Sequence, residues 1–172
     1  MKITKITIIS LLMIIPLFYF IYSFFPGESA AKLKTGVTAP DTVFISEKDT
    51  FDIAKYKGKV VLLNFWASWS KSSRLENKNL VRIYQKYKTN PKVVFVSISL
   101  DTDESSWKAA IEEDEMTWTA HFCDFKKYES PVAKAYQIST LPMAYLIDKT
   151  GTIVKSTAKS QEIESEIDGL LK

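Results

Sequence analysis

Residues 59–74 read KVVLLNFWASWSKSSR, and this stretch decides the fold. Its first part, Lys59 to Phe65, is rich in β-branched residues and almost continuously apolar, which is typical of a strand covered on both faces. Lys92 to Leu100 has the same character. Between these stretches, apolar side chains recur at helical spacing, namely Leu80, Ile83, Tyr84 and Tyr87. The order strand, helix, strand predicts two neighbouring parallel strands joined by a right-handed crossover.

The rest of the chain predicts further alternation of helices and strands. The expected elements are a helix at Glu104–Glu113, a strand at Trp118–Asp124, a short helix at Pro131–Tyr136, an antiparallel hairpin of Met143–Ile147 with Thr152–Ser156, and a last helix after Ser160. The fold class is therefore α/β, with a central mixed β-sheet flanked by α-helices.

The N-terminus carries an apolar run from Ile6 to Phe25 that contains no charged residue. Twenty helical residues rise about 30 Å, the thickness of a bilayer's hydrocarbon core. Lys2 and Lys5 precede the run and favour a cytoplasmic N-terminus, so residues 1–25 are predicted to be a transmembrane anchor. A cleaved signal peptide, with its site near residues 29–31, is the alternative. Residues 26–38 are expected to be a linker and 39–172 the folded domain.

The charge and the rare residues limit the function classes. The chain has 23 basic and 20 acidic residues, and without Lys2 and Lys5 the balance is 21 to 20, which gives no reason to expect a nucleic-acid partner. Cys123 is the single cysteine, so an intramolecular disulfide is excluded. One cysteine and one histidine, His121, do not make a soft-metal site, and we expect no metal and no cofactor. Cys123 is either a small buried apolar residue or a reactive thiol.

Several motifs together resemble the membrane-tethered, extracytoplasmic thioredoxin-like proteins of the TlpA and ResA type. The matching pieces are Ala39-Pro40-Asp41, the block from Lys57 to Trp69, Leu141-Pro142, and Leu146 to Gly151. Their order and spacing fit the family along nearly the whole domain. The resemblance implies a thioredoxin-like fold, a location in the bacterial cell envelope outside the cytoplasmic membrane, and thiol-disulfide exchange.

The resemblance also assigns roles to single residues. It maps the family's nucleophilic and resolving cysteines to Ser70 and Ser73, where no thiol is present, so both are expected to be inactive. It maps a glutamate that tunes proton transfer to Glu76. It maps the family's cis-proline to Pro142, which leaves the backbone of Leu141 free to pair with an extended polypeptide.

Local physical chemistry offers structural roles for the same residues. Ser70 is suited to capping the helix that follows it; alternatively, Ser73 caps it and Glu76 reaches back, as in a capping box. Trp69 either packs beside the loop or is an exposed aromatic surface for a partner. A serine hydrolase is disfavoured because the only histidine, His121, lies on a separate predicted strand.

Two function classes follow from the serines. In the first, the chain is a redox-inactive, membrane-tethered module that binds a protein or peptide at a groove formed by Trp69, Leu141 and Pro142. In the second, it is a thiol-disulfide oxidoreductase whose cysteines were exchanged for Ser70 and Ser73. The departure of Lys71-Ser72 from the usual interior of the motif favours the first class.

Overall fold

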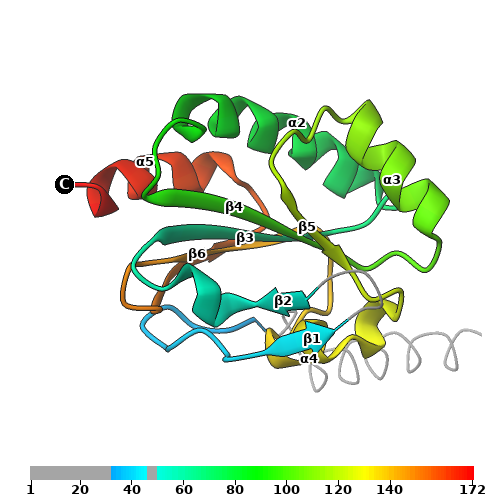
Figure 1. Cartoon of the computed structure of the whole chain (residues 1–172), viewed down its shortest axis with the longest axis horizontal. Helices are drawn as coiled ribbons and strands as arrows, with labels where there is room; N and C mark the ends of the chain where they lie inside the picture. The colour runs from blue at the N-terminus through cyan, green and yellow to red at the C-terminus, as the bar shows by residue number, and fades with distance from the viewer. Residues whose placement is uncertain (1–31, 46–49) are drawn as a thin grey trace, which may run out of the picture. The chain divides into compact units, whose positions relative to one another are not determined.

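The computed structural model describes residues 32–45 and 50–172, and the chain from Ala31 to Lys172 forms one compact unit. Five strands form a mixed sheet in the order β5-β4-β3-β6-β7 (Figure 1). Their bounds are β3 (Val60–Trp66), β4 (Val93–Ser99), β5 (Ala120–Cys123), β6 (Met143–Ile147) and β7 (Ile153–Thr157). The pairs β3–β4 and β4–β5 are parallel, and β3–β6 and β6–β7 are antiparallel. The expected mixed sheet is confirmed.

Helix α2 (Lys71–Tyr87) connects β3 to β4, as the spacing of apolar residues predicts. All seven residues of β3 are buried, in agreement with its continuous apolar sequence. The parallel register pairs Val60 with Val93 at one end and Trp66 with Ser99 at the other. The carboxyl ends of β3, β4 and β5 therefore meet at one edge of the sheet, where α2 begins.

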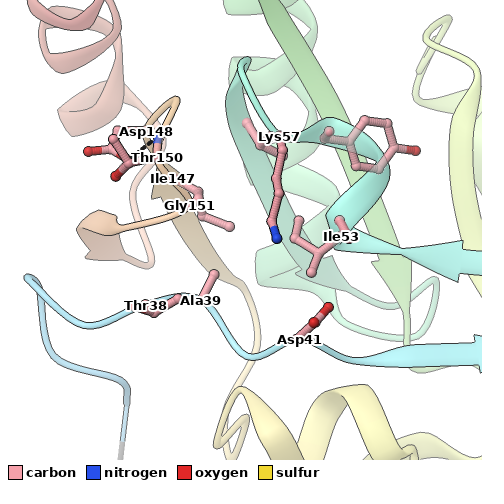
Figure 2. A pocket seen from close by; sticks show the side chains of 12 residues that line it. Thr38, Ala39, Asp41, Ile53, Lys57, Ile147, Asp148, Thr150 and Gly151 are labelled. Atoms are coloured by element: carbon pink, nitrogen blue, oxygen red, sulfur yellow. Dashed lines mark hydrogen bonds between the residues drawn. The ribbon is translucent and has the colours of Figure 1, made fainter.

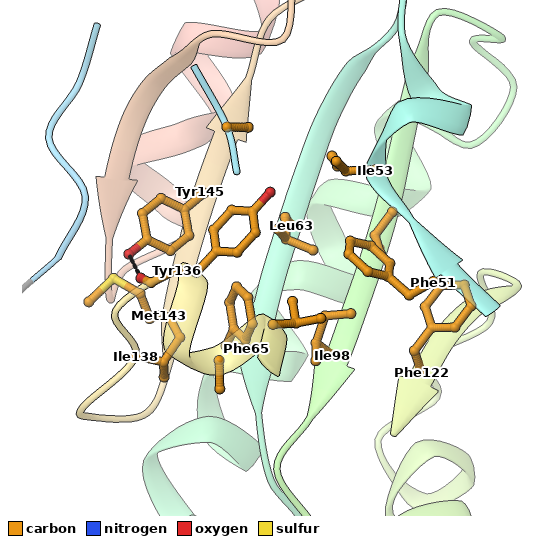
Figure 3. Packing of buried hydrophobic residues seen from close by; sticks show 14 of the residues in the cluster. Phe51, Ile53, Leu63, Phe65, Ile98, Phe122, Tyr136, Ile138, Met143 and Tyr145 are labelled. Carbon is orange, nitrogen blue, oxygen red and sulfur yellow. Dashed lines mark hydrogen bonds between the residues drawn. The ribbon is translucent and has the colours of Figure 1, made fainter. Parts of the chain in front are cut away.

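Side chains alternate between the two faces of the sheet and build two cores. Val60, Leu62 and Trp66 pack beneath α2, α3 (Glu104–Glu113) and α5 (Gln161–Leu170), which lie together on one side in Figure 1. Val61, Leu63 and Phe65 face the other side, toward α4 (Pro131–Ala135). Figure 3 shows this second core, in which the rings of Phe65, Tyr136 and Tyr145 contact one another.

The structure also contains elements that the sequence patterns did not predict. Strands β1 (Val43–Ile45) and β2 (Thr50–Asp52) pair antiparallel, and two short 3₁₀ segments, η1 (Ile53–Tyr56) and η2 (Lys127–Glu129), follow β2 and β5. Phe51 of β2 is fully buried, and its ring meets Phe122 at a centroid distance of 5.5 Å. Strands of three residues are too short to show an alternating pattern, so this layer was missed.

The segment before the first strand lies along the hairpin of β6 and β7. The Gly36 N–H donates to the Ile153 carbonyl, and the Ile153 N–H donates to the Val37 carbonyl. The Ala39 N–H donates to the carbonyl of Gly151, whose φ of 90° suits the hairpin turn. No helix within residues 32–45 and 50–172 is long and apolar enough to cross a membrane. The expected anchor, residues 1–25, lies outside this part of the chain.

Candidate functional site

The stretch at residues 67–73 lies where β3 ends and α2 begins. Ser70 has extended backbone angles and is the N-cap of α2, and its Oγ accepts a hydrogen bond from the Ser73 N–H at 3.2 Å. The Ser73 hydroxyl also donates to Ser70 Oγ, at 2.8 Å. Both serines are buried. Of the two caps that the sequence allowed, Ser70 is the one present, and such a cap contributes about 1 kcal/mol.

Glu76 faces away from these serines. Its Oε1 accepts hydrogen bonds from the N–H, at 2.6 Å, and from the hydroxyl of Ser160, at the start of α5, and its Oε2 accepts from Asn79. The alternative of a capping box, with Ser73 as cap and Glu76 reaching back, is therefore wrong. Ser160 occupies the N-cap position of α5 but makes no capping bond of its own, so the carboxylate of Glu76 satisfies that helix end instead.

The loop before β6 lies against the start of α2. The peptide bond between Leu141 and Pro142 is cis, as the resemblance predicts. The Ser72 hydroxyl donates to the Leu141 carbonyl oxygen at 3.2 Å, and Ser72 Oγ lies 3.2 Å from Ser70 Oγ. The structure thus brings Ser70, Ser73, Leu141 and Pro142 into one site, and it leaves Glu76 outside.

The two tryptophans of the motif have different environments. Trp66 is fully buried beneath α2, whereas Trp69 is 52% exposed. The Lys127 ammonium lies 5.9 Å from the centroid of the Trp69 ring, within the range of a cation–π contact. Leu75, on the second turn of α2, is 58% exposed. Trp69 is therefore the exposed aromatic of the two alternatives, and Trp66 is core packing.

Asp101 is a site residue that the motif analysis missed. It is buried, and its carboxylate accepts hydrogen bonds from the N–H and the hydroxyl of Ser68 and from the hydroxyl of Ser99, at 2.6 to 3.2 Å. These bonds hold the backbone one residue before Trp69. The signal was available in the sequence, because Asp101 directly follows a predicted parallel strand and such strands end at the same edge of the sheet as β3.

The start of α2 is also tied to α3. Arg74 forms ion pairs with Asp114 at 2.6 Å and with Glu113 at 2.8 Å, and the Asn77 amide donates to the same Asp114 carboxylate at 2.7 Å. The hydrogen bonds to these carboxylates raise the pKa of the Arg74 guanidinium. The first turn of the helix is therefore held from two sides, by Asp101 through Ser68 and by this cluster.

Cys123 reaches the same edge of the sheet, because the strand register pairs Trp66 with Ser99 and Ser99 with Cys123. It is buried, and its thiol lies 3.6 Å from the Asp101 carbonyl oxygen. Desolvation raises the pKa of this thiol to about 11, so the reactive thiolate is a very minor species at neutral pH. Of the two alternatives for Cys123, the buried apolar residue fits this environment.

His121 does not approach the serines. Its ring stacks on Trp118 at 5.1 Å between centroids, and Nε2 lies 3.1 Å from the Met116 carbonyl oxygen. Desolvation lowers the pKa of the imidazole to about 4. Because His121 sits mid-strand, two strands from Asn64, it is not placed to act as a base for Ser70.

A pocket of about 160 Å³ lies at the opposite end of the sheet (Figure 2). Its floor includes Val61 and Ile147, which pair in register, whereas the serine site adjoins the pair of Phe65 and Met143. Lys57 and Asp41 lie at its rim. The pocket and the serine site are therefore separated by the length of β3.

Comparisons with known proteins agree with this geometry. A thioredoxin-like family model matches residues 58–153. The chain is 30% identical to the thiol-disulfide oxidoreductase ResA of Bacillus anthracis, over 82% of this chain and 79% of the relative, and 29% identical to ResA of Geobacillus kaustophilus, over 95% and 93%. A solved thiol-disulfide oxidoreductase from Bacteroides fragilis superimposes with a TM-score of 0.71 at 32% identity, covering 78% of this chain and 99% of that structure. With the strand order, the cis-proline and the helix start after β3 in place, the chain belongs to the thioredoxin-like family, in its TlpA and ResA-type branch.

Proposed function

We propose that this chain is a thioredoxin-like protein that binds polypeptide and does not transfer electrons. The observation that carries the proposal is the pair of hydroxyls at the start of α2. Ser70 and Ser73, which the family resemblance aligns with the redox-active cysteines, bond to each other at 2.8 Å. Disulfide exchange requires a thiolate nucleophile, and a serine hydroxyl does not perform that chemistry.

Cys123 does not replace the missing pair. As the single cysteine it has no partner for an intramolecular disulfide, and its burial keeps it in the unreactive thiol form. The chain therefore holds no dithiol that could accept or donate two electrons.

The features suited to binding are present at the same place. About half of the surface of Trp69 is exposed, and aromatic residues at the centre of an interface contribute strongly to affinity. The Leu141 backbone lies outside the ladder of β6, which begins at Met143, so an extended segment has an edge to pair with. Main-chain pairing together with one aromatic contact is tolerant of sequence, and this combination fits an unfolded or extended polypeptide as the partner.

The proposal includes attachment to a membrane, with the folded unit outside the cytoplasm. Its support is the uncharged run from Ile6 to Phe25 behind two lysines, together with the resemblance to tethered relatives. Alkaline extraction of membranes checks this part: an uncleaved anchor keeps the full-length chain in the membrane pellet, whereas a mature protein that starts near Lys32 refutes it.

Binding is tested with reduced, carboxymethylated α-lactalbumin, a permanently unfolded polypeptide without free thiols. We expect the wild-type chain to bind it, and Trp69→Ala to raise the Kd about ten-fold or more. Val43→Ala is the matched control, because Val43 is also an exposed apolar residue but belongs to β1, which pairs with β2 in a separate two-stranded sheet. Its Kd should stay unchanged.

The same preparation should reduce insulin no faster than a Cys123→Ala variant. Absence of polypeptide binding, or equal binding by the wild type and Trp69→Ala, would contradict the proposed recognition surface. Insulin reduction that depends on Ser70 or Cys123 would contradict the proposed lack of electron transfer.

A further inference from the structure

The two hydrogen-bonding groups of the Leu141 backbone, its N–H and its carbonyl oxygen, differ in their partners. Within residues 32–45 and 50–172, its N–H has no hydrogen-bond acceptor, and its carbonyl oxygen has one donor, the Ser72 hydroxyl at 3.2 Å. Pro142 follows and has no N–H to offer. Of the two backbone groups that a polypeptide strand would pair with, the carbonyl oxygen therefore already has a partner within the protein, the Ser72 hydroxyl.

The direction of the hydroxyl bonds follows from counting protons and lone pairs. A serine hydroxyl has one proton to donate and two lone pairs to accept with. Ser70 Oγ already accepts from the N–H and from the hydroxyl of Ser73, so its own proton is directed to Ser72 Oγ. Ser72 in turn donates to Leu141. The bonds form one chain that runs from Ser73 through Ser70 and Ser72 to the Leu141 carbonyl, and such chains strengthen each member.

We propose that the Ser72 hydroxyl is a latch on the polypeptide groove, which competes with the ligand for the Leu141 carbonyl. This inference rests on the proposed function. In an antiparallel pair, two opposed residues exchange both of their N–H···O bonds, so a bound strand uses the Leu141 N–H and carbonyl together. Among the described residues the N–H has no acceptor, whereas the carbonyl oxygen already accepts from Ser72, so the N–H of a bound strand displaces the hydroxyl or shares the oxygen with it in a weaker bond. Ser72 is exposed, so its hydroxyl has water to bond to when it turns away.

If the Ser72 hydroxyl competes with the ligand, its removal raises the affinity for the polypeptide. Removal of a group that contacts the ligand would lower that affinity. In Ser72→Ala the Leu141 carbonyl has no internal competitor, and Ser70 still accepts from Ser73, so the cap of α2 is kept. We expect Ser72→Ala to bind reduced, carboxymethylated α-lactalbumin about three- to ten-fold more tightly than the wild type, as the loss of one competing neutral hydrogen bond implies. Ser72→Thr keeps a hydroxyl and should bind like the wild type.

Ser105→Ala is the matched control. Ser105 is exposed and stands two residues after the N-cap of α3, as Ser72 stands two residues after the N-cap of α2, so both changes delete the same atom at the same helix position. Its Kd should equal that of the wild type. In the ligand-free protein, Ser72→Ala should also shift the carbonyl carbon resonance of Leu141 in the direction of a lost hydrogen bond, and Ser105→Ala should not.

The outcomes separate this inference from the proposed function. If the wild type binds and Ser72→Ala binds equally well or more weakly, the latch is refuted and the proposed polypeptide binding stands. If neither chain binds the unfolded protein, both ideas are refuted. Tighter binding by Ser72→Ala, with Ser105→Ala and Ser72→Thr at the wild-type value, supports both.

Discussion

Helices α2 and α3 begin with the same cap geometry in two different environments. In α3, Asp103 Oδ1 accepts from the N–H of Ser106 at 2.7 Å and from its hydroxyl at 2.6 Å. In α2, Ser70 Oγ accepts from the N–H of Ser73 at 3.2 Å and from its hydroxyl at 2.8 Å. Each helix thus has a cap residue and a serine three positions later that donates to it twice. The cap of α3 is exposed, and the cap of α2 is buried.

The difference shows what burial does to a helix start. A carboxylate in water keeps its hydration and adds a favourable interaction with the helix dipole, so Asp103 suits the exposed end. A buried charge carries a large desolvation cost, and a neutral hydroxyl at Ser70 avoids it. An ionised carboxylate can only accept hydrogen bonds, so Asp103 donates none to a further residue. The hydroxyl of Ser70 accepts hydrogen bonds and also donates one. The hydrogen bonds of the buried cap therefore continue from Ser70 to Ser72 and from Ser72 to the Leu141 carbonyl.

The largest expected effect comes from placing cysteines at both caps. Ser70→Cys with Ser73→Cys, and Asp103→Cys with Ser106→Cys, should each form an intramolecular disulfide, because in both helices the two side chains already meet. Only the first pair lies beside Trp69 and the Leu141 backbone. We expect it to reduce insulin at least about ten-fold faster than the second, since its helix start lowers the thiolate pKa next to a binding surface.

Both double variants are made in a Cys123→Ala background, so that thiol titration counts the new pair alone. Equal insulin turnover by the two pairs would show that a helix start is enough and that the neighbouring surface adds nothing. A pair at 70 and 73 that does not oxidise would show that the loop no longer has the geometry of a redox site.

The sequence predicted the parts of this site that are local or strongly periodic. β3, α2 and β4 were evident from apolar spacing, and Ser70 was one of the two caps that the sequence allowed for α2. Placing Pro142 beside them required the family resemblance, because 69 residues separate Ser72 from Leu141 and no local pattern links them. The contact of Glu76 with Ser160 was missed for the same reason, because it depends on which elements meet in space and the capping-box spacing offered a local partner. Asp101 was missed although its place just after β4 put it at the edge of the sheet where β3 ends.

The next effect in size is the loss of the buried cap in Ser70→Ala. The Ser73 N–H and hydroxyl both lose their acceptor, and Ser73 is fully buried, so water does not readily replace it. We expect the free energy of unfolding to fall by about 1–2 kcal/mol in urea titrations. The loss should be constant from pH 3 to 8, because neither hydroxyl titrates there. Ser105→Ala should leave the unfolding free energy within the error, and a loss of the same size in that control would contradict the role of the cap.

The smallest effect is the loss of the exposed cap in Asp103→Ala, and it should depend on pH. The hydrogen bonds from the Ser106 hydroxyl and N–H lower the pKa of Asp103 below its usual value of 3.8. A lowered pKa in the folded state means that folding favours the ionised carboxylate, so its contribution is fully present above the unfolded-state pKa and is lost as the pH falls through the folded-state pKa.

Urea titrations should therefore show Asp103→Ala less stable than the wild type at pH 7, with a smaller deficit than Ser70→Ala. The deficit should shrink as the pH is lowered from 5 to 2.5, while that of Ser70→Ala stays constant over the range in which both proteins remain folded. Parallel pH profiles for the two variants would mean that the charge at Asp103 does not distinguish the two caps.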